Sequence, residues 1–118
     1  MVEKKAGDII ARATAHFDAQ ERDFVEVDEW GDENGSLKIY WTPMTIGDRT
    51  KIAAKTKGRD GPESLVEVII LKAQDEEGNQ MFTLNDKMAL NHHTDSRVLV
   101  KIASAIMRDE IDGQAEGN

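Results

Sequence analysis

The sequence predicts a small α+β fold, an antiparallel two-stranded hairpin packed with four to five helices, mostly α. Two short segments alternate apolar and polar residues around turn-forming residues, and several longer segments repeat apolar residues at helical spacing. A length of 118 residues with 39% hydrophobic residues fits one modest core. We expect a single compact domain over residues 8–108, with residues 1–7 and 109–118 as flexible tails, because both ends are charged and poor in apolar residues.

The first expected element is a helix over about residues 9–20. Asp8 is a candidate cap, since its carboxylate can accept hydrogen bonds from the free N–H groups of the first turn. Ile10, Ala13 and Phe17 recur at three- and four-residue spacing, which places them on one face. The helix is therefore expected to be amphipathic and to belong to the compact domain.

A hairpin is expected next, with strands over residues 24–30 and 37–42. Residues 31–35 supply two glycines, an asparagine and two acids, which is the chemistry of a turn. Pro43 ends the second strand because it has no N–H group to donate. The alternation assigns five residues to the apolar faces of the two strands: Val25, Val27, Leu37, Ile39 and Trp41.

Two helices follow the hairpin. Thr45 and Asp48 have the spacing of a capping box, which predicts a helix over about residues 46–57, stopped by Gly58. Pro62 opens the next element, residues 63–74. Its β-branched residues would also suit a strand, but a proline in the first turn and the length of the segment favour a buried helix.

The last third of the chain is expected to hold an acidic turn and two more helices. Residues 75–78 form the turn, and residues 80–82 are extended. Thr83 starts a second capping-box pattern and a short helix to about residue 90, and Thr94 or Asp95 caps a final helix over residues 96–107. The residues expected in the core are Ile39, Leu65, Ile69, Leu99, Ile102 and Ile106.

Composition and charge exclude several classes of protein. The chain has no cysteine, which excludes disulfide scaffolds, thiolate metal sites and thiol catalysis. A net charge of −8 repels nucleic acid and anionic lipid on average, so we expect neither as a partner. No apolar stretch approaches the ~18 residues of a membrane span, and the first residues lack the apolar run of a secretory signal. The expected location is cytoplasmic, and the expected partner is a protein.

No residue pattern predicts catalysis, a cofactor or a metal. Residues 75–79 resemble part of a calcium loop, but the frame would place Ala73 and Leu84 at ligand positions, so an acidic turn is the favoured interpretation. The histidines are His16, His92 and His93. The adjacent His92 and His93 do not form a pair on one helix face, so exposed loop histidines before the last helix are the simpler interpretation. We therefore expect a protein that is not an enzyme.

Charge and aromatic residues suggest where a partner binds. Residues 49–59 form a basic cluster, and residues 18–33 hold eight acids and one arginine. Such clusters suit weak head-to-tail self-association, although a solvated helix face is the simpler explanation of the basic one. For the two tryptophans, packing of the sheet onto the helices is the favoured interpretation, and an exposed anchor for a partner is the alternative. The residues expected to contact a partner are Trp30, Trp41, Arg49, Lys51 and Lys55.

The order of the segments resembles a known family. An amphipathic helix leads into VEVDEWG (25–31) and LKIYWTPMT (37–45). A polar helix follows, then VIILKAQDEEGNQMF (68–82) and the final VLVKIASAIM (98–107). Over about residues 8–107 this resembles the tail assembly chaperones of long-tailed bacteriophages of the siphophage type.

The resemblance implies a non-enzymatic role in virion morphogenesis. Such chaperones bind the tape measure protein in the bacterial host cytoplasm, keep it soluble and help to recruit tail tube subunits, and they are absent from the mature virion. Many also have a longer form made by ribosomal frameshifting. Two alternatives stay open: another small phage morphogenesis protein, for tail completion or head–tail joining, and an acidic regulator that mimics nucleic acid.

Overall fold

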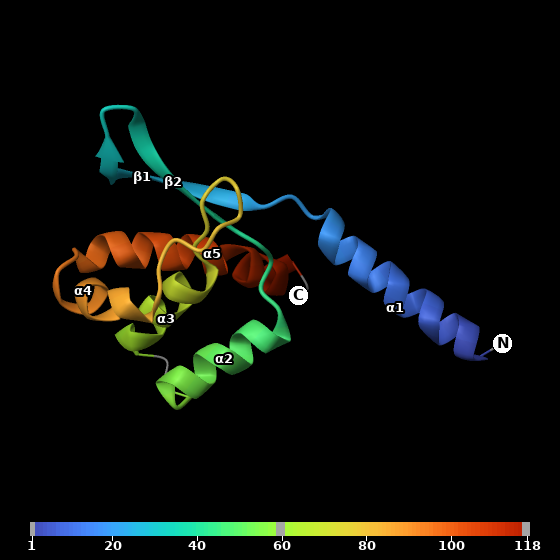
Figure 1. Ribbon diagram of the computed structural model, residues 1–118. Helices are drawn as coiled ribbons and strands as arrows, with labels where there is room; N and C mark the ends of the chain where they lie inside the picture. Colours follow the sequence, from blue (N-terminus) through green and yellow to red (C-terminus); the bar gives the residue numbers. More distant parts are fainter. Residues whose placement is uncertain (1, 59–60, 117–118) are drawn as a thin grey trace.

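The computed structural model describes the backbone of residues 2–58 and 61–116 and the side chains of residues 7–58 and 61–108. The elements in chain order are α1 (Val2–Ala19), β1 (Asp23–Asp32), β2 (Gly35–Trp41), α2 (Ile46–Thr56), α3 (Pro62–Lys72), the 3₁₀ turn η1 (Leu84–Asp86), α4 (Lys87–His92) and α5 (Ser96–Glu116). The predicted α+β class is confirmed. In Figure 1 the hairpin lies on one side of α5 and α3, α2 lies on the other side, and α1 projects outward.

The hairpin keeps the predicted faces. Antiparallel pairs such as Val25 with Ile39 and Val27 with Leu37 place the expected apolar residues together. Val27 and Ile39 are fully buried, and the sheet packs on α5. The alternation of the sequence therefore predicted the buried face correctly.

The turn of the hairpin is shorter than the five residues expected. The strands run on until Asp32 pairs with Gly35, which leaves only Glu33 and Asn34 between them. The register also shifts, so residues 28–31 of β1 face Ser36 alone. A Cβ on Gly31 would lie 2.4 Å from the Gly35 carbonyl oxygen, and Gly35 has a φ of +122°. The two glycines thus serve a strand irregularity and a tight turn rather than a wide loop.

Helix α2 begins as predicted. Asp48 N–H donates to Thr45 Oγ1 over 3.0 Å, and Thr45 N–H donates back to Asp48 Oδ2 over 3.1 Å. The helix ends at Thr56, and Lys57 already has the left-handed φ of 56° before Gly58. The left-handed stop therefore starts one residue earlier than expected.

Helix α3 is the buried helix that the sequence favoured. Pro62 occupies its first turn, and residues 66–70 are buried in succession because α2 packs on one side of α3 and α5 on the other. Of the six expected core residues only Leu65 is half-buried, and it packs against the edge of the core. The β-branched residues here reflect burial rather than a strand.

The segment after α3 lies against β2. Tyr40 N–H donates to Gln74 O over 2.9 Å and Gln74 N–H donates to Tyr40 O over 2.8 Å, so one residue extends the edge of the sheet. Thr83 and Asp86 then form the second predicted capping box. Asp95 Oδ1 accepts from Arg97 N–H over 2.8 Å, which identifies Asp95 as the residue that caps α5.

Both ends of the chain differ from the expectation. Helix α1 begins at Val2, so Asp8 lies inside it and pairs with Arg12 over 2.6 Å rather than capping it. Helix α5 continues past Met107 to Glu116. Most of the two expected tails is thus helical backbone. Charged residues at helical spacing, as in the Asp8–Arg12 pair, can extend a helix beyond its apolar part.

Candidate partner-binding site

Helix α1 carries an apolar face without a partner. In the described part of the chain it makes no extensive contact with another element, and it projects from the body in Figure 1. Ile9 and Ile10 are 60% and 65% exposed, and Phe17 is 37% exposed. At 100° per residue, Ile10, Ala13 and Phe17 fall within a sector of about 60°. The stripe of α1 is thus largely exposed among the described side chains, whereas the sequence led us to expect α1 within the compact domain.

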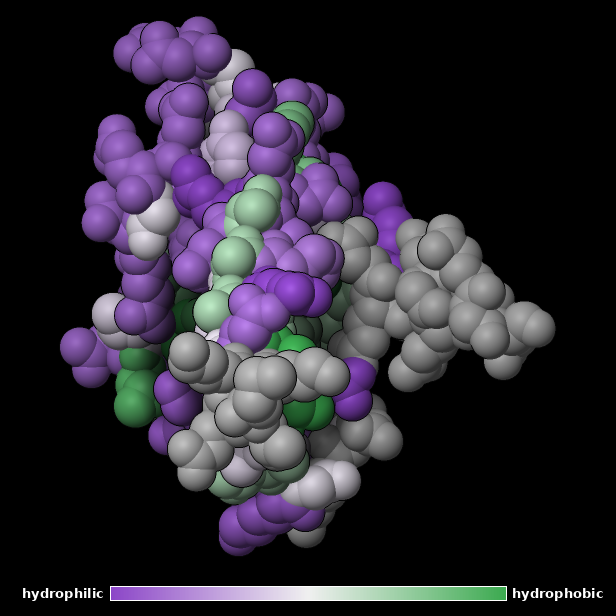
Figure 2. All heavy atoms as spheres, turned by 90° about the vertical axis from the view of Figure 1, so that its right-hand side faces the viewer, coloured by the Kyte–Doolittle hydropathy of each residue, from purple (hydrophilic) through white to green (hydrophobic). Residues whose placement is uncertain are grey.

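The surroundings of α1 are hydrophilic. Figure 2 views the molecule from the side toward which α1 projects; among the residues coloured there most are hydrophilic, and the hydrophobic ones form small separate patches. The exposed apolar residues of α1 are therefore unusual for this surface. Stripes of this kind are typical of helices that pack on a partner.

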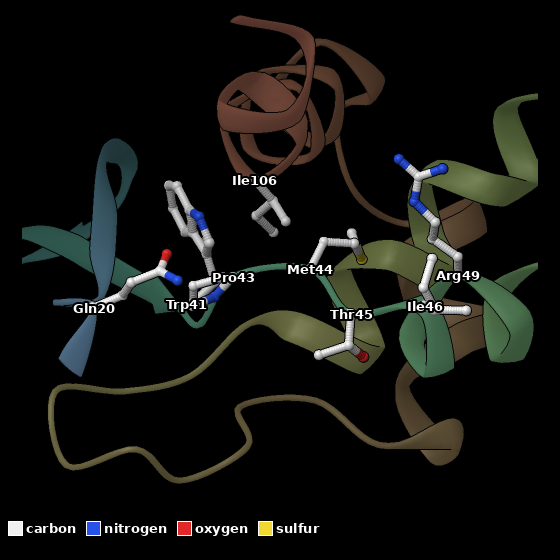
Figure 3. A pocket seen from close by; sticks show the side chains of 8 residues that line it. All are labelled: Gln20, Trp41, Pro43, Met44, Thr45, Ile46, Arg49 and Ile106. Atoms are coloured by element: carbon white, nitrogen blue, oxygen red, sulfur yellow. The ribbon is translucent and has the colours of Figure 1, made fainter. Parts of the chain in front are cut away.

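A groove begins where α1 ends. This proximal groove has a volume of about 440 Å³ and lies between the start of α2, the end of β2 and α5. In Figure 3 the Trp41 ring and Ile106 face each other across it, and Met44 lies beside them. Its lining residues are Gln20, Trp41, Pro43, Met44, Thr45, Ile46, Arg49 and Ile106. Because Gln20 directly follows α1, the apolar stripe and the groove lie next to each other along the chain.

A buried lysine fixes the segment between β2 and α2, which supplies part of the lining of the proximal groove. Lys72, at the end of α3, donates from Nζ to Thr42 Oγ1 over 3.0 Å, to Pro43 O over 3.2 Å and to Asp48 Oδ2 over 2.8 Å. Three acceptors satisfy all three hydrogens of the ammonium group. The segment between β2 and α2 is therefore fixed to α3, which keeps the groove in shape.

The same contacts set the charge state of Asp48. Burial by itself would raise the pKa of Asp48, but the hydrogen bonds from Lys72 and from Thr45 N–H outweigh it, so the pKa lies below its ordinary value. Asp48 thus remains ionised at neutral pH. It acts both as the partner of Thr45 in the capping box of α2 and as the counter-ion of Lys72.

A second groove, the lysine groove, lies between α2, α3 and η1. It has a volume of about 200 Å³. Its lining residues are Lys51, Ile52, Lys55, Glu67, Ile70, Leu71, Gln80 and Leu84. Gln80 Nε2 donates to Ile70 O over 3.0 Å, which fixes the loop before η1 against α3. The lysine groove is apolar inside and basic at its rim.

The tryptophans expected as partner contacts lie in different surroundings. Trp41 is only 3% exposed, so it is not an exposed anchor; its ring packs in the core, as the favoured interpretation held, and forms a wall of the proximal groove. Trp30 is half-buried, and its ring lies edge-on to Phe82 with 6.3 Å between ring centres. The strand alternation accounts for the burial of Trp41, whereas Trp30 lies in the irregular part of β1 between Val27 and Asp32.

The five expected contact residues do not form one site. Trp41 and Arg49 line the proximal groove, Lys51 and Lys55 line the lysine groove, and Trp30 lies at a polar hollow beside the hairpin turn. Arg59, the last residue of the expected basic cluster, lies outside the described residues. The structure thus divides the basic cluster and the aromatic residues among three places.

Sequence reasoning missed three features of these surfaces. It did not identify Lys72 as the anchor of the proximal groove, Glu67 as a buried acid of the lysine groove, or the apolar stripe of α1 as exposed. A signal existed for the first two, since Glu67 and Lys72 interrupt an otherwise apolar buried run. No local signal distinguishes an exposed stripe from a buried one.

The described side chains contain no group of three or more histidine, cysteine, aspartate or glutamate residues that could hold a metal ion. The carboxylate in the turn after α3 is used locally: Asp75 Oδ1 accepts from the N–H groups of Glu77 and Asn79, each over 2.9 Å. The Asn79 hydrogen bond is the largest cause of a pKa of Asp75 below its ordinary value.

None of the helices among residues 2–58 and 61–116 is long and apolar enough to cross a membrane.

Comparison with protein-family models, with curated proteins and with solved structures found no match to this chain. The functional argument therefore depends on the surfaces described above and on the resemblance in the order of segments.

Proposed function

We propose that this protein is a non-enzymatic tail assembly chaperone, which binds the tape measure protein of a long-tailed bacteriophage and assists assembly of tail tube subunits around it. It would act in the bacterial host cytoplasm and be absent from the mature virion. The observation that carries the proposal is the uncovered apolar face of α1. A projecting amphipathic helix is suited to pack along a long helical client, because helices associate through apolar stripes of this kind.

The proximal groove supports the same proposal. It adjoins the last turn of α1 through Gln20, so a client helix lying along α1 would meet Trp41, Met44 and Ile106 in the groove. The net charge of −8 would keep a complex with an apolar client in solution. Binding and solubilisation would thus use different parts of the surface.

Coexpression with the tape measure protein tests the proposal. The soluble fraction of the tape measure protein is expected to rise when the wild-type chain is present. It is expected to fall back to the level without chaperone for the double variant Ile10→Asp/Phe17→Asp, which places two charges in the apolar stripe. Ala15→Asp is the matched control, because Ala15 lies on the opposite side of α1 and is exposed.

Two results would contradict the proposal. One is a double variant that solubilises the tape measure protein as well as the wild type does. The other is retention of the protein in purified phage particles, which is the behaviour of a tail completion or head–tail joining protein.

A further inference from the structure

The lysine groove has the size of one large side chain. Its volume of about 200 Å³ is below the ~300–1,000 Å³ typical of small-molecule sites. Ile52 of α2, Ile70 and Leu71 of α3 and Leu84 of η1 supply apolar walls. Leu84 is 58% exposed, so one wall is open to a ligand from outside. An apolar body that fills the groove would remove this surface from water.

The groove is also lined by a glutamate with a buried carboxylate oxygen that is ion-paired with one lysine but accepts no hydrogen bond from the described residues. Glu67 is 4% exposed at its side chain, and its Oε1 atom accepts no hydrogen bond from the described residues. Lys87 Nζ lies 3.1 Å from Oε1 and pairs with it electrostatically, but the geometry is not that of a hydrogen bond. Buried polar atoms nearly always have a hydrogen-bond partner, so a ligand that brings a donor would complete the site.

The rim of the groove is positively charged. Lys51 and Lys55 lie one turn apart on α2, are exposed, and have no ion-pair partner among the described residues. Acidic residues on either side of an inserted side chain would pair with them. Lys51, Lys55 and Lys87 together also disfavour an arginine in the groove, although Glu67 alone would attract one.

We propose that the lysine groove is a docking site for an acidic peptide segment of another protein, which inserts a tryptophan or tyrosine side chain. The ring fills the apolar space, its N–H or O–H donates to Glu67 Oε1, and flanking carboxylates pair with Lys51 and Lys55. Tryptophan and tyrosine are the side chains that combine a large apolar body with a single polar tip. The inference goes beyond the proposed function, because it uses a different surface from α1 and holds for any partner with such a segment.

Titration of the full chain with short peptides, followed by the NMR shifts of its backbone amides, tests the proposal. The probe is the pentapeptide Asp-Glu-Trp-Glu-Asp with blocked ends. We expect shifts at the residues that line the lysine groove. Replacing the central Trp with Phe should weaken binding at least about tenfold, because a hydrogen bond to a charged group is lost. Peptides with a central Arg or with flanking Lys residues should bind more weakly still.

Variants separate the parts of the site. Lys51→Glu/Lys55→Glu should abolish peptide binding. Lys57→Glu changes a lysine at the end of α2 that does not line the groove, and it should reduce binding less than threefold. Glu67→Leu should retain binding and lose the preference for Trp over Phe. The amide spectrum of each variant reports that it is folded.

Four results would overturn the proposal: shifts confined to another surface, equal affinity for the Trp and Phe peptides, equal effects of the groove and Lys57 variants, or concentration-dependent shifts at the apolar walls of the groove (Ile52, Ile70 and Leu84) without any peptide. The last would identify a second copy of the chain as the occupant. None of them affects solubilisation through α1, which the Ile10→Asp/Phe17→Asp variant tests separately.

Discussion

Helices α1 and α5 have nearly the same pattern of apolar residues and opposite surroundings. In α1, Ile10, Ala13 and Phe17 form a stripe that is exposed among the described residues; in α5, Leu99, Ile102 and Ile106 form a stripe that is buried against α3 and the hairpin. Amphipathic spacing predicts a helix with one face to be covered. It does not predict whether the cover comes from the same chain.

The two helices also differ in what stabilises them. An isolated helix of 18 residues is marginal in water, since most helical stability in proteins comes from packing of the apolar face. Helix α5 receives that stabilisation from the core, whereas α1 depends on its own hydrogen bonds and on side-chain pairs such as Asp8–Arg12. A partner that covered the apolar stripe of α1 would supply the packing energy that α5 receives from the core.

Amide hydrogen exchange should show the largest difference between the two helices. We expect opening free energies near zero along α1 and values close to the global free energy of unfolding, typically ~5–15 kcal/mol, in the buried half of α5. The measurement is residue-resolved exchange of the isolated protein. Equal protection of α1 and α5 would mean that α1 packs on the body in solution.

Alanine substitutions should separate the two stripes next. Ile102→Ala is expected to cost ~2–5 kcal/mol of unfolding free energy, because it leaves a cavity in a fully buried position. Ile10→Ala should change stability by less than ~0.5 kcal/mol, as is usual for exposed sites. Urea midpoints at unchanged slope give both values. A similar loss for the two variants would contradict the assignment of α1 as unpacked.

Helix α2 differs from α1 in being fixed to the body, because Lys72 of α3 forms hydrogen bonds to residues at the start of α2 and just before it. Asp48→Asn should cost ~1.5–3 kcal/mol near neutral pH through weaker hydrogen bonds to a charged group. The matched control is Asp86→Asn, which changes a capping box without a buried lysine and should cost less.

The pH dependence of that difference follows from the lowered pKa of Asp48. A carboxyl group with a lowered folded pKa contributes stability that is complete above its unfolded pKa of about 3.9 and is lost as the pH falls through the folded value. The stability gap between wild type and Asp48→Asn should therefore shrink below about pH 4. A gap that stays constant down to pH 2 would show that the charge of Asp48 is unimportant.

Self-association should have the smallest effect. The acids of the hairpin and the lysines of α2 lie on opposite sides of α3 and α5 in Figure 1, which suits a repeating contact between copies. Exposed ion pairs contribute only ~0–1 kcal/mol each and are screened beyond ~8 Å at physiological salt. We therefore expect weak association at low salt that Lys51→Glu/Lys55→Glu reduces.

Sedimentation at several salt concentrations distinguishes this charge contact from one through α1. Association that ignores salt and charge reversal but disappears in Phe17→Asp would place the contact on the apolar stripe instead. A strict monomer at high concentration and low salt would contradict both.

Most elements of the fold could be predicted because their signals are local. The capping pairs Thr45–Asp48 and Thr83–Asp86 act within four residues, so the sequence predicted both helix starts. The alternation in the hairpin predicted its buried face. Its turn was missed because the close approach of Gly31 to the Gly35 carbonyl depends on strand pairing, which composition does not encode.

The candidate sites were less predictable because their parts are distant in the sequence. The proximal groove joins Gln20 to Ile106, and the lysine groove joins Lys51 to Leu84. The charge of Lys51 and Lys55 could be predicted from the sequence, but their position in the same groove as Glu67 could not. Trp41 was ambiguous for the same reason, since burial of its ring depends on α5 packing over the hairpin.

The attachment of α1 has a mechanical consequence. Arg22 lies in the short segment between α1 and β1, and its contacts fix that segment to the body. Its Nη1 atom donates to Asp75 O over 2.9 Å, its Nη2 atom donates to the next carbonyl oxygen, and its guanidinium lies 5.1 Å from the centre of the Tyr40 ring. A force that pulls on the start of β1 is therefore resisted both by the first residue pairs of the hairpin and by the hydrogen bonds to the turn after α3. Those bonds would have to break together before the segment that joins α1 to β1 separated from the body.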